Sequence, residues 1–251
     1  MGSNREGNEL PIHTVTLTSF YIAMYELTQA EYEAVMGSNP AHDFGVGANY
    51  PVYYASWFDA IEYCNRRSIY EGLTPCYSYG TDGTNPDNWT IGWNTNYLNH
   101  TNVSCSWTAN GYRLPTEAEW EFAARGGNQS NNYLYSGSNS IGDIAWYRAN
   151  AYDVGSTHPD YGTHQVGTKT SNELDIFDMS GNVWEWCWDI YGTYSSGAQT
   201  NPTGAINGSD RVQHGGSWTS SSARCIVSNR YFNYAIGSNY SLGFRIVRNA
   251  N

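Results

Sequence analysis

Five cysteines are the most reactive side chains in this sequence, because a thiolate can act as a nucleophile, a metal ligand or a disulfide partner. They are Cys64, Cys76, Cys105, Cys187 and Cys225. No two are spaced as Cys-x-x-Cys, so a zinc pattern is missing, and the odd count leaves at least one free thiol in a monomer. The pairing stays open. Cys187 and Cys225 lie in two tryptophan-rich segments that could be neighbours, and buried reduced thiols are the alternative.

The six histidines add no recognisable catalytic or metal-binding pattern. They are His13, His42, His100, His158, His164 and His214. None forms a helical metal-binding pair, and no Ser/His/Asp arrangement can be identified from spacing. The sequence therefore names no catalytic residue.

Composition limits the kinds of partner. The 251 residues carry a net charge of −11, which disfavours nucleic acid and anionic membranes as partners. Only 14% of residues are charged, whereas 22 tyrosines and 10 tryptophans can supply much of a core. No apolar run approaches the roughly 20 residues of a membrane span, and no signal peptide is visible. We expect a single domain over residues 1–251, at the cell surface or outside the cell, whose export signal has been removed.

Three helices are predicted by capping boxes, in which a hydroxyl and an acid three residues later satisfy backbone N–H groups of the first turn. The boxes span residues 28–31, 56–59 and 116–119, and glycines 37, 72 and 126 predict the helix ends. Alternating apolar residues predict a strand over 13–25, a hairpin of 76–79 with 103–107, and strands at 183–190 and 244–247. The polar stretch 128–172 is expected to be a long loop that is functional or held by other parts of the chain.

Several segments together resemble the formylglycine-generating enzyme family, also called sulfatase-modifying factors. They are residues 20–32 and 51–64, GYRLPTEAEWEFAARGG at 111–127, DMSGNVWEW at 178–186, GGSW at 215–218 and GFR at 243–245. The resemblance implies an irregular, loop-rich α+β fold of the C-type lectin-like kind, with three short helices and short, mostly antiparallel strands. Within the motifs, we expect Arg113 and Arg125 to hold carboxylates or loop carbonyls, and Trp184, Trp186 and Trp218 to lie in the core.

The catalytic pattern of that family is incomplete here. Its oxidase chemistry uses two cysteines between the GGSW and GFR motifs, and this segment holds only Cys225. We therefore expect no enzyme activity. The alternatives are a formylglycine-generating-type oxidase acting on a substrate cysteine, and an inactive structural homologue.

The segment between these motifs, residues 219–241, is composed like a binding surface. It is rich in Tyr, Ser and Asn and contains no Glu, Lys, Gln, Met or Trp. It resembles the variable region of diversity-generating retroelement proteins, whose mutagenesis randomises adenines in codons such as AAC. A codon with its first two bases randomised and C last cannot encode those five residue types. An ordinary polar loop in a chain rich in Asn, Ser and Tyr is the alternative.

This resemblance implies a variable ligand-binding region at about 213–245 that binds a ligand, expected to be a protein on another cell or surface. Residues expected to be fixed are Cys225, Arg230, Gly243, Phe244 and Arg245. Candidate variable, ligand-binding residues are Thr219, Ser220, Ser221, Arg224, Tyr231, Phe232, Asn233, Tyr234, Ser238, Asn239 and Tyr240.

A structural calcium ion is the one cofactor that the resemblance suggests. The family site maps to Ser180, Gly181, Val183 and Glu185. Calcium takes six to eight oxygen ligands, and only four can be named. Glu185 could instead pair with an arginine such as Arg113.

Overall fold

The capping boxes begin the three longest helices of the protein. A computed structural model describes residues 1–5 and 7–250. Helices α1 (Gln29–Met36), α2 (Trp57–Tyr70) and α3 (Glu117–Ala124) begin directly after Thr28, Ser56 and Thr116. Each hydroxyl accepts a backbone N–H three residues on, and the acid at that position accepts the cap's own N–H. The three predicted helices are therefore confirmed.

The remaining helical turns are short and follow no cap that the sequence analysis identified. One is α4 (Ile141–Ile144), and the next is a single π-helical turn at Arg148–Tyr152. Short 3-10 helices lie at Gly7–Glu9, Pro86–Asn88, Tyr97–Asn102, Gly127–Gln129 and Ser222–Cys225. No helix in the described part of the chain combines the length and the apolar character that crossing a bilayer needs.

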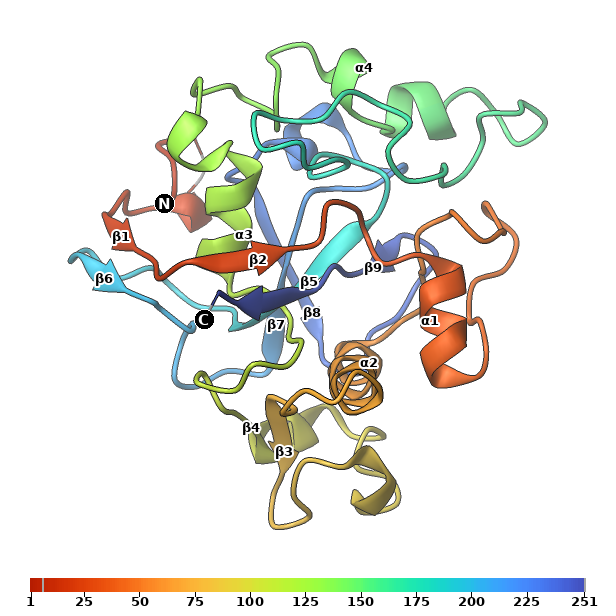
Figure 1. The fold of residues 1–251 in the computed structure, drawn as a ribbon. Coiled ribbons are helices and arrows are strands. Elements are labelled where there is room, and N and C mark those ends of the chain that lie inside the picture. Colours follow the sequence, from red (N-terminus) through yellow and green to blue (C-terminus); the bar gives the residue numbers. More distant parts are fainter. Residues whose placement is uncertain (6, 251) are drawn as a thin grey trace.

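A four-stranded sheet forms the centre, with its strands in the order β8-β7-β5-β9. Strands β5 (Trp184–Ile190), β7 (Asp210–His214) and β8 (Arg230–Tyr234) are antiparallel, and β9 (Leu242–Gly243) runs parallel to β5. Three two-stranded sheets surround it (Figure 1). They pair β1 (Val15–Thr16) with β6 (Gln199–Thr200), β2 (Phe20–Ile22) with β10 (Val247–Asn249), and β3 (Tyr77–Tyr79) with β4 (Val103–Cys105).

Two strand predictions are wrong in extent. The single strand predicted over 13–25 is two short strands, β1 and β2, which belong to different sheets. The strand predicted at 244–247 is mostly irregular, and Arg245 in its middle forms a buried ion pair with Glu185. The predicted hairpin and the strand at 183–190 are confirmed by the β3–β4 pairing and by β5.

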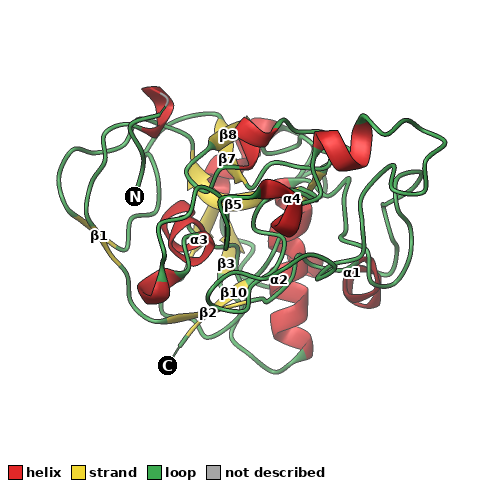
Figure 2. Ribbon diagram, turned by 90° about the horizontal axis from the view of Figure 1, so that it is seen from above, coloured by secondary structure: helices red, strands yellow, loops and turns green. Residues whose placement is uncertain are grey.

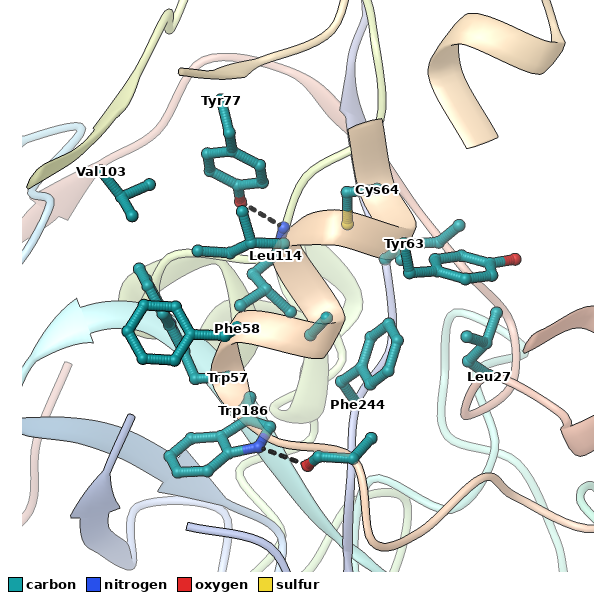
Figure 3. Packing of buried hydrophobic residues seen from close by; sticks show 14 of the residues in the cluster. Leu27, Trp57, Phe58, Tyr63, Cys64, Tyr77, Val103, Leu114, Trp186 and Phe244 are labelled. Carbon is teal, nitrogen blue, oxygen red and sulfur yellow. Dashed lines mark hydrogen bonds between the residues drawn. The ribbon is translucent and has the colours of Figure 1, made fainter. Parts of the chain in front are cut away.

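Helix α2 carries the largest part of the core. Its buried residues include Trp57, Phe58 and Tyr63, and Figure 3 shows them packed with Phe244. The polar atoms of Trp57 and Tyr63 have hydrogen-bond partners. The Nε1 of Trp57 donates to the Cys187 carbonyl at 3.0 Å. Most of the chain outside these elements is loop (Figure 2), so aromatic packing replaces much of the usual strand and helix framework.

The long stretch 128–172 is held against the C-terminal segment (Figure 1). The Arg148 N–H donates to the Ser220 carbonyl at 2.9 Å, and the Val227 N–H donates to the Leu134 carbonyl at 3.2 Å. Trp146 stacks on His164 with 3.5 Å between ring centroids. These contacts keep the polar stretch beside the predicted variable segment.

Candidate ligand-binding surface

A buried ion pair fixes the start of strand β8. The Nε and Nη2 of Arg230 donate to the two carboxylate oxygens of Glu117, each at 2.7 Å. The Nε2 of His214 lies 2.9 Å from Glu117, and the Tyr194 hydroxyl donates to the same carboxylate at 2.9 Å. Burial alone would raise the pKa of Glu117, but the charge of Arg230 and the His214 contact outweigh it and lower the pKa to about 2.

Strand β8 is an edge strand with three aromatic rings half in water. Tyr231, Phe232 and Tyr234 are 45%, 41% and 50% exposed. Neighbouring rings hold them in place. Tyr231 contacts Trp184 with ring centroids 5.6 Å apart, and Phe232 contacts Tyr191 at 4.5 Å. The rings therefore have fixed positions and free faces, which suits recognition at little entropic cost.

The turn after β8 extends this surface. Tyr240 is 39% exposed, Ser238 is exposed and Asn239 is half-buried. The Tyr54 N–H donates to the Asn239 carbonyl at 2.9 Å, and the Tyr240 carbonyl accepts from Trp218 Nε1 at 3.1 Å. The backbone of the turn is thus tied to the framework while its side chains reach solvent.

The first part of the segment is less exposed than β8. Ser221 is exposed, Thr219 and Arg224 are half-buried, and the guanidinium of Arg224 lies 5.3 Å from the centre of the Tyr231 ring. Ser220 is buried, because its hydroxyl lies 3.1 Å from that of Ser217 and its backbone is bonded into the fold. Ser220 therefore offers little of its side chain to a ligand, and the ligand-binding role of all eleven residues stays a prediction.

The residues expected to be fixed are buried beneath this surface. They are Cys225, Arg230, Gly243, Phe244 and Arg245. The GGSW motif has a matching constraint, since Gly216 has a φ of +74° and a Cβ there would lie 2.7 Å from the sulfur of Cys225. Only glycine suits that conformation and that contact.

The five cysteines are free thiols, and all except half-buried Cys105 are buried. Cys187 and Cys225 belong to different hydrophobic clusters, so the expectation that they could be neighbours finds no support. Burial raises the pKa of Cys225 to about 12. A buried thiol that holds its proton at neutral pH is a poor nucleophile and a poor metal ligand.

The one carboxylate among the predicted calcium ligands, Glu185, is engaged by protein groups, and the calcium site itself stays a prediction. Arg245 donates to both oxygens of Glu185, with the Nη2 contact at 2.7 Å, and Trp120 Nε1 donates to one of them at 2.7 Å. The partner of Glu185 is thus Arg245, because Arg113 is paired with Glu119. Among the residues that the structure describes, no group of three or more His, Cys, Asp or Glu side chains could hold a metal ion.

Buried acids near this pair have raised pKa values. Burial and the nearby charge of Glu185 raise the pKa of Asp178 to about 6, although the Gly167 N–H and Arg245 oppose the shift. The pKa of Glu26 is also raised, mainly by burial and then by Asp178. One oxygen of Asp178 has no hydrogen-bond partner.

Other motif residues behave as scaffold. Trp186 and Trp218 are buried, while Trp184 is only half-buried because it reaches toward Tyr231. The Nε of Arg125 pairs with Glu121 at 2.8 Å, and its Nη2 donates to the Gly2 carbonyl at 3.1 Å. The expected framework roles of the arginines are therefore confirmed.

This architecture defines a class: an α+β, C-type lectin-like scaffold of the formylglycine-generating type, which displays an aromatic surface near its C-terminal end. Residues 1–250 match the family described as "Sulfatase-modifying factor enzyme 1-like domain". The chain belongs to that family.

Individual relatives show how diverse the family is. The chain is 41% identical over 250 residues to the chaperone protein LppX of Paenibacillus barcinonensis, covering 93% of this chain and 81% of LppX. It is 30% identical to the formylglycine-generating enzyme of Mus musculus, covering 96% and 69%. The structure of Treponema denticola variable protein 1 superposes with a TM-score of 0.83 at 33% identity, covering 99% and 91%. The resemblance to the enzyme family and to variable proteins on its scaffold is thus confirmed.

Several aromatic residues that were not predicted from the sequence lie next to the candidate surface, although they are far away in the chain. Phe44 contacts Tyr240 with ring centroids 5.3 Å apart, and Tyr97 contacts Tyr234 at 4.8 Å. Tyr152 and Tyr161 contact Trp218 at 5.7 Å and 5.3 Å. The unusual length of the 128–172 loop was the one signal in the sequence that pointed to two of them.

Proposed function

We propose that this protein is a non-catalytic recognition protein that binds a protein ligand through the exposed side chains of residues 219–241. The observation that carries the proposal is the contrast within β8: Arg230 is locked in a buried ion pair, and the aromatic residues that follow it are exposed. A rigid support with solvent-facing Tyr, Phe, Ser and Asn side chains is how protein-binding loops achieve affinity.

The relatives support a protein as the ligand. One similar protein is named a chaperone, a class whose clients are proteins, and one similar structure is named a variable protein. The acidic charge argues against nucleic acid. We also propose that the protein acts at the cell surface or outside the cell, where recognition of another surface would take place.

The burial of Cys225 gives the oxidase alternative less support than the recognition proposal has. The lone thiol between the GGSW and GFR motifs, Cys225, is fully buried, and no second cysteine lies in that segment. The thiolate chemistry of the enzymes needs an accessible, ionised sulfur. Assaying a cysteine-containing peptide with copper and oxygen tests this alternative, and turnover that depends on Cys225 would restore it.

A display library tests the proposal with a defined target. The ten accessible candidate positions are randomised with codons ending in C, and binders are selected on hen lysozyme. A matched library randomises ten exposed positions on other faces, among them Tyr21, Tyr70 and Ile206. Folded, lysozyme-specific binders from the first library alone are expected. If neither library yields binders, or if both do equally, the proposal is wrong.

A further inference from the structure

Three aromatic residues outside the C-terminal segment form one continuous cluster with it. We call Phe44, Tyr152 and Tyr161 the aromatic rim. Phe44 and Tyr161 lie 6.2 Å apart, and Tyr161 and Tyr152 lie 5.7 Å apart, measured between ring centroids. All three contact Trp218, which is itself buried.

The rim is also continuous with the candidate binding residues. Tyr240 contacts both Phe44 and Trp218, at 5.3 Å and 5.7 Å. Tyr152 is 38% exposed, and Phe44 and Tyr161 are half-buried. A ligand seated on Tyr240 would therefore reach the rim without crossing another element of the fold.

Backbone contacts hold the rim in a fixed position relative to the segment. The Arg148 N–H donates to the Ser220 carbonyl, and the Arg148 guanidinium lies 5.6 Å from the centre of the Tyr152 ring. The Thr163 N–H donates to the Phe44 carbonyl at 3.0 Å. Because the two hydrogen bonds join backbone atoms, they do not depend on which side chains occupy the candidate variable positions.

The charge around the rim favours a basic partner. Asp43, Asp153 and Asp160 have side chains that are about half exposed or more. Asp153 is paired with Arg148, whereas the other two lie only near histidines. Four arginines are buried in the framework and therefore add no positive charge to the surface: Arg113, Arg211, Arg230 and Arg245. Opposite charge on a partner would speed association with such a surface.

We propose that the aromatic rim is a second, sequence-constant part of the recognition site, and that the protein ligand meets it with a basic surface. The inference rests on the proposed function, since it extends the same surface. The candidate variable residues would set which ligand is bound, and the rim would contribute affinity to every complex. Aromatic side chains that lose their contact with water in an interface commonly contribute much of its binding energy.

The experiment uses several independent lysozyme binders from the display library, chosen to differ at the randomised positions. Lysozyme is suitable because it is a basic protein. In each binder, Tyr152→Ala and Tyr161→Ala are expected to weaken binding tenfold or more, and Tyr152→Phe is expected to retain most of the affinity. Tyr21→Ala and Tyr70→Ala, on exposed tyrosines elsewhere, are the matched controls. A thermal melt of each variant separates lost contacts from lost folding.

The contribution of the acidic side chains to binding can be measured separately. The double variant Asp43→Asn, Asp160→Asn is expected to slow association with lysozyme several-fold at low salt and to have little effect at high salt. If stable Tyr152→Ala and Tyr161→Ala variants both bind within twofold of the parent's affinity, the proposal that the rim contributes to binding is wrong. An unchanged association rate for the double variant would contradict the proposal that the ligand meets the rim with a basic surface. A failure to obtain any binder would instead count against the proposed function.

Discussion

Arg230, the first residue of β8, and Glu117, the first residue of α3, form a buried two-point ion pair with both N···O distances at 2.7 Å. The two residues are 113 positions apart in the chain. The pair joins helix α3 to the strand that carries the exposed aromatic residues. It explains how a strand at the edge of a sheet can present large rings without losing its position.

Removing one partner of this pair should destabilise the fold strongly. Arg230→Met leaves the Glu117 carboxylate buried without its main counter-charge, which costs about 3–5 kcal/mol. Arg148→Met removes the exposed pair with Asp153 and should cost under about 1 kcal/mol. Urea unfolding monitored by tryptophan fluorescence measures both variants. Equal losses in the two would show that the buried pair has no special role.

The exposed aromatic residues should matter little to stability. Tyr231→Ala and Tyr234→Ala remove rings that are half in water, so each should lower the free energy of unfolding by roughly 1 kcal/mol or less. Trp186→Ala, in the buried core, should cost about 3–5 kcal/mol. A collapse of the melting temperature in the tyrosine variants would mean that these rings belong to the core, which contradicts a recognition role.

Asp178 should make stability fall as pH rises. Its pKa is about 6 in the folded state and 3.8 in the unfolded state, so the folded protein holds the proton more tightly. This contribution is fully present below pH 3.8 and is lost as pH rises through 6. Asp178→Asn removes the ionisation, and asparagine tolerates the positive φ of 59° at this position.

The gain of Asp178→Asn over the parent should therefore grow between pH 4 and pH 7. A difference of about two pKa units between the folded and unfolded states corresponds to about 3 kcal/mol in the free energy of unfolding. Urea unfolding of both proteins across this range, in buffer containing EDTA, measures the difference. A constant difference at all pH values would show that Asp178 ionises normally in the fold.

Calcium should not change the stability of the protein. Both oxygens of Glu185, the one carboxylate among the predicted ligands, are engaged by Arg245 and Trp120. Melting temperatures in millimolar calcium and in EDTA are expected to agree within a degree. A clear increase with calcium would bring back the metal site predicted from the sequence at Ser180, Gly181, Val183 and Glu185.

Cys225 should be unreactive in the native protein. Burial raises the pKa of its thiol to about 12, so little thiolate exists at pH 8. A thiol reagent such as dithionitrobenzoate is expected to modify Cys225 only after denaturation. Rapid modification of the native protein at Cys225 would support the oxidase alternative.

The helices were predictable because their signals are local. A hydroxyl and an acid three residues apart satisfy the N–H groups of the same turn, as at Thr116 and Glu119, and no distant contact is needed. The strands were predicted less well for the opposite reason. The stretch 13–25 alternates like one strand, but its two halves pair with different partners, residues 199–200 and 247–249. The sequence pattern does not show where those partners lie.

The sequence alone determined the family scaffold, the three capped helices, the incomplete cysteine pair and the Tyr-, Ser- and Asn-rich segment, because all of these are properties of residue type and spacing. Only the tertiary structure decided that Glu185 pairs with Arg245, that Ser220 is buried, and that Phe44, Tyr152 and Tyr161 meet Tyr240 around Trp218. The physical reason is that burial and charge pairing depend on which distant segments pack together, and a loop-rich fold leaves few local rules that fix this packing.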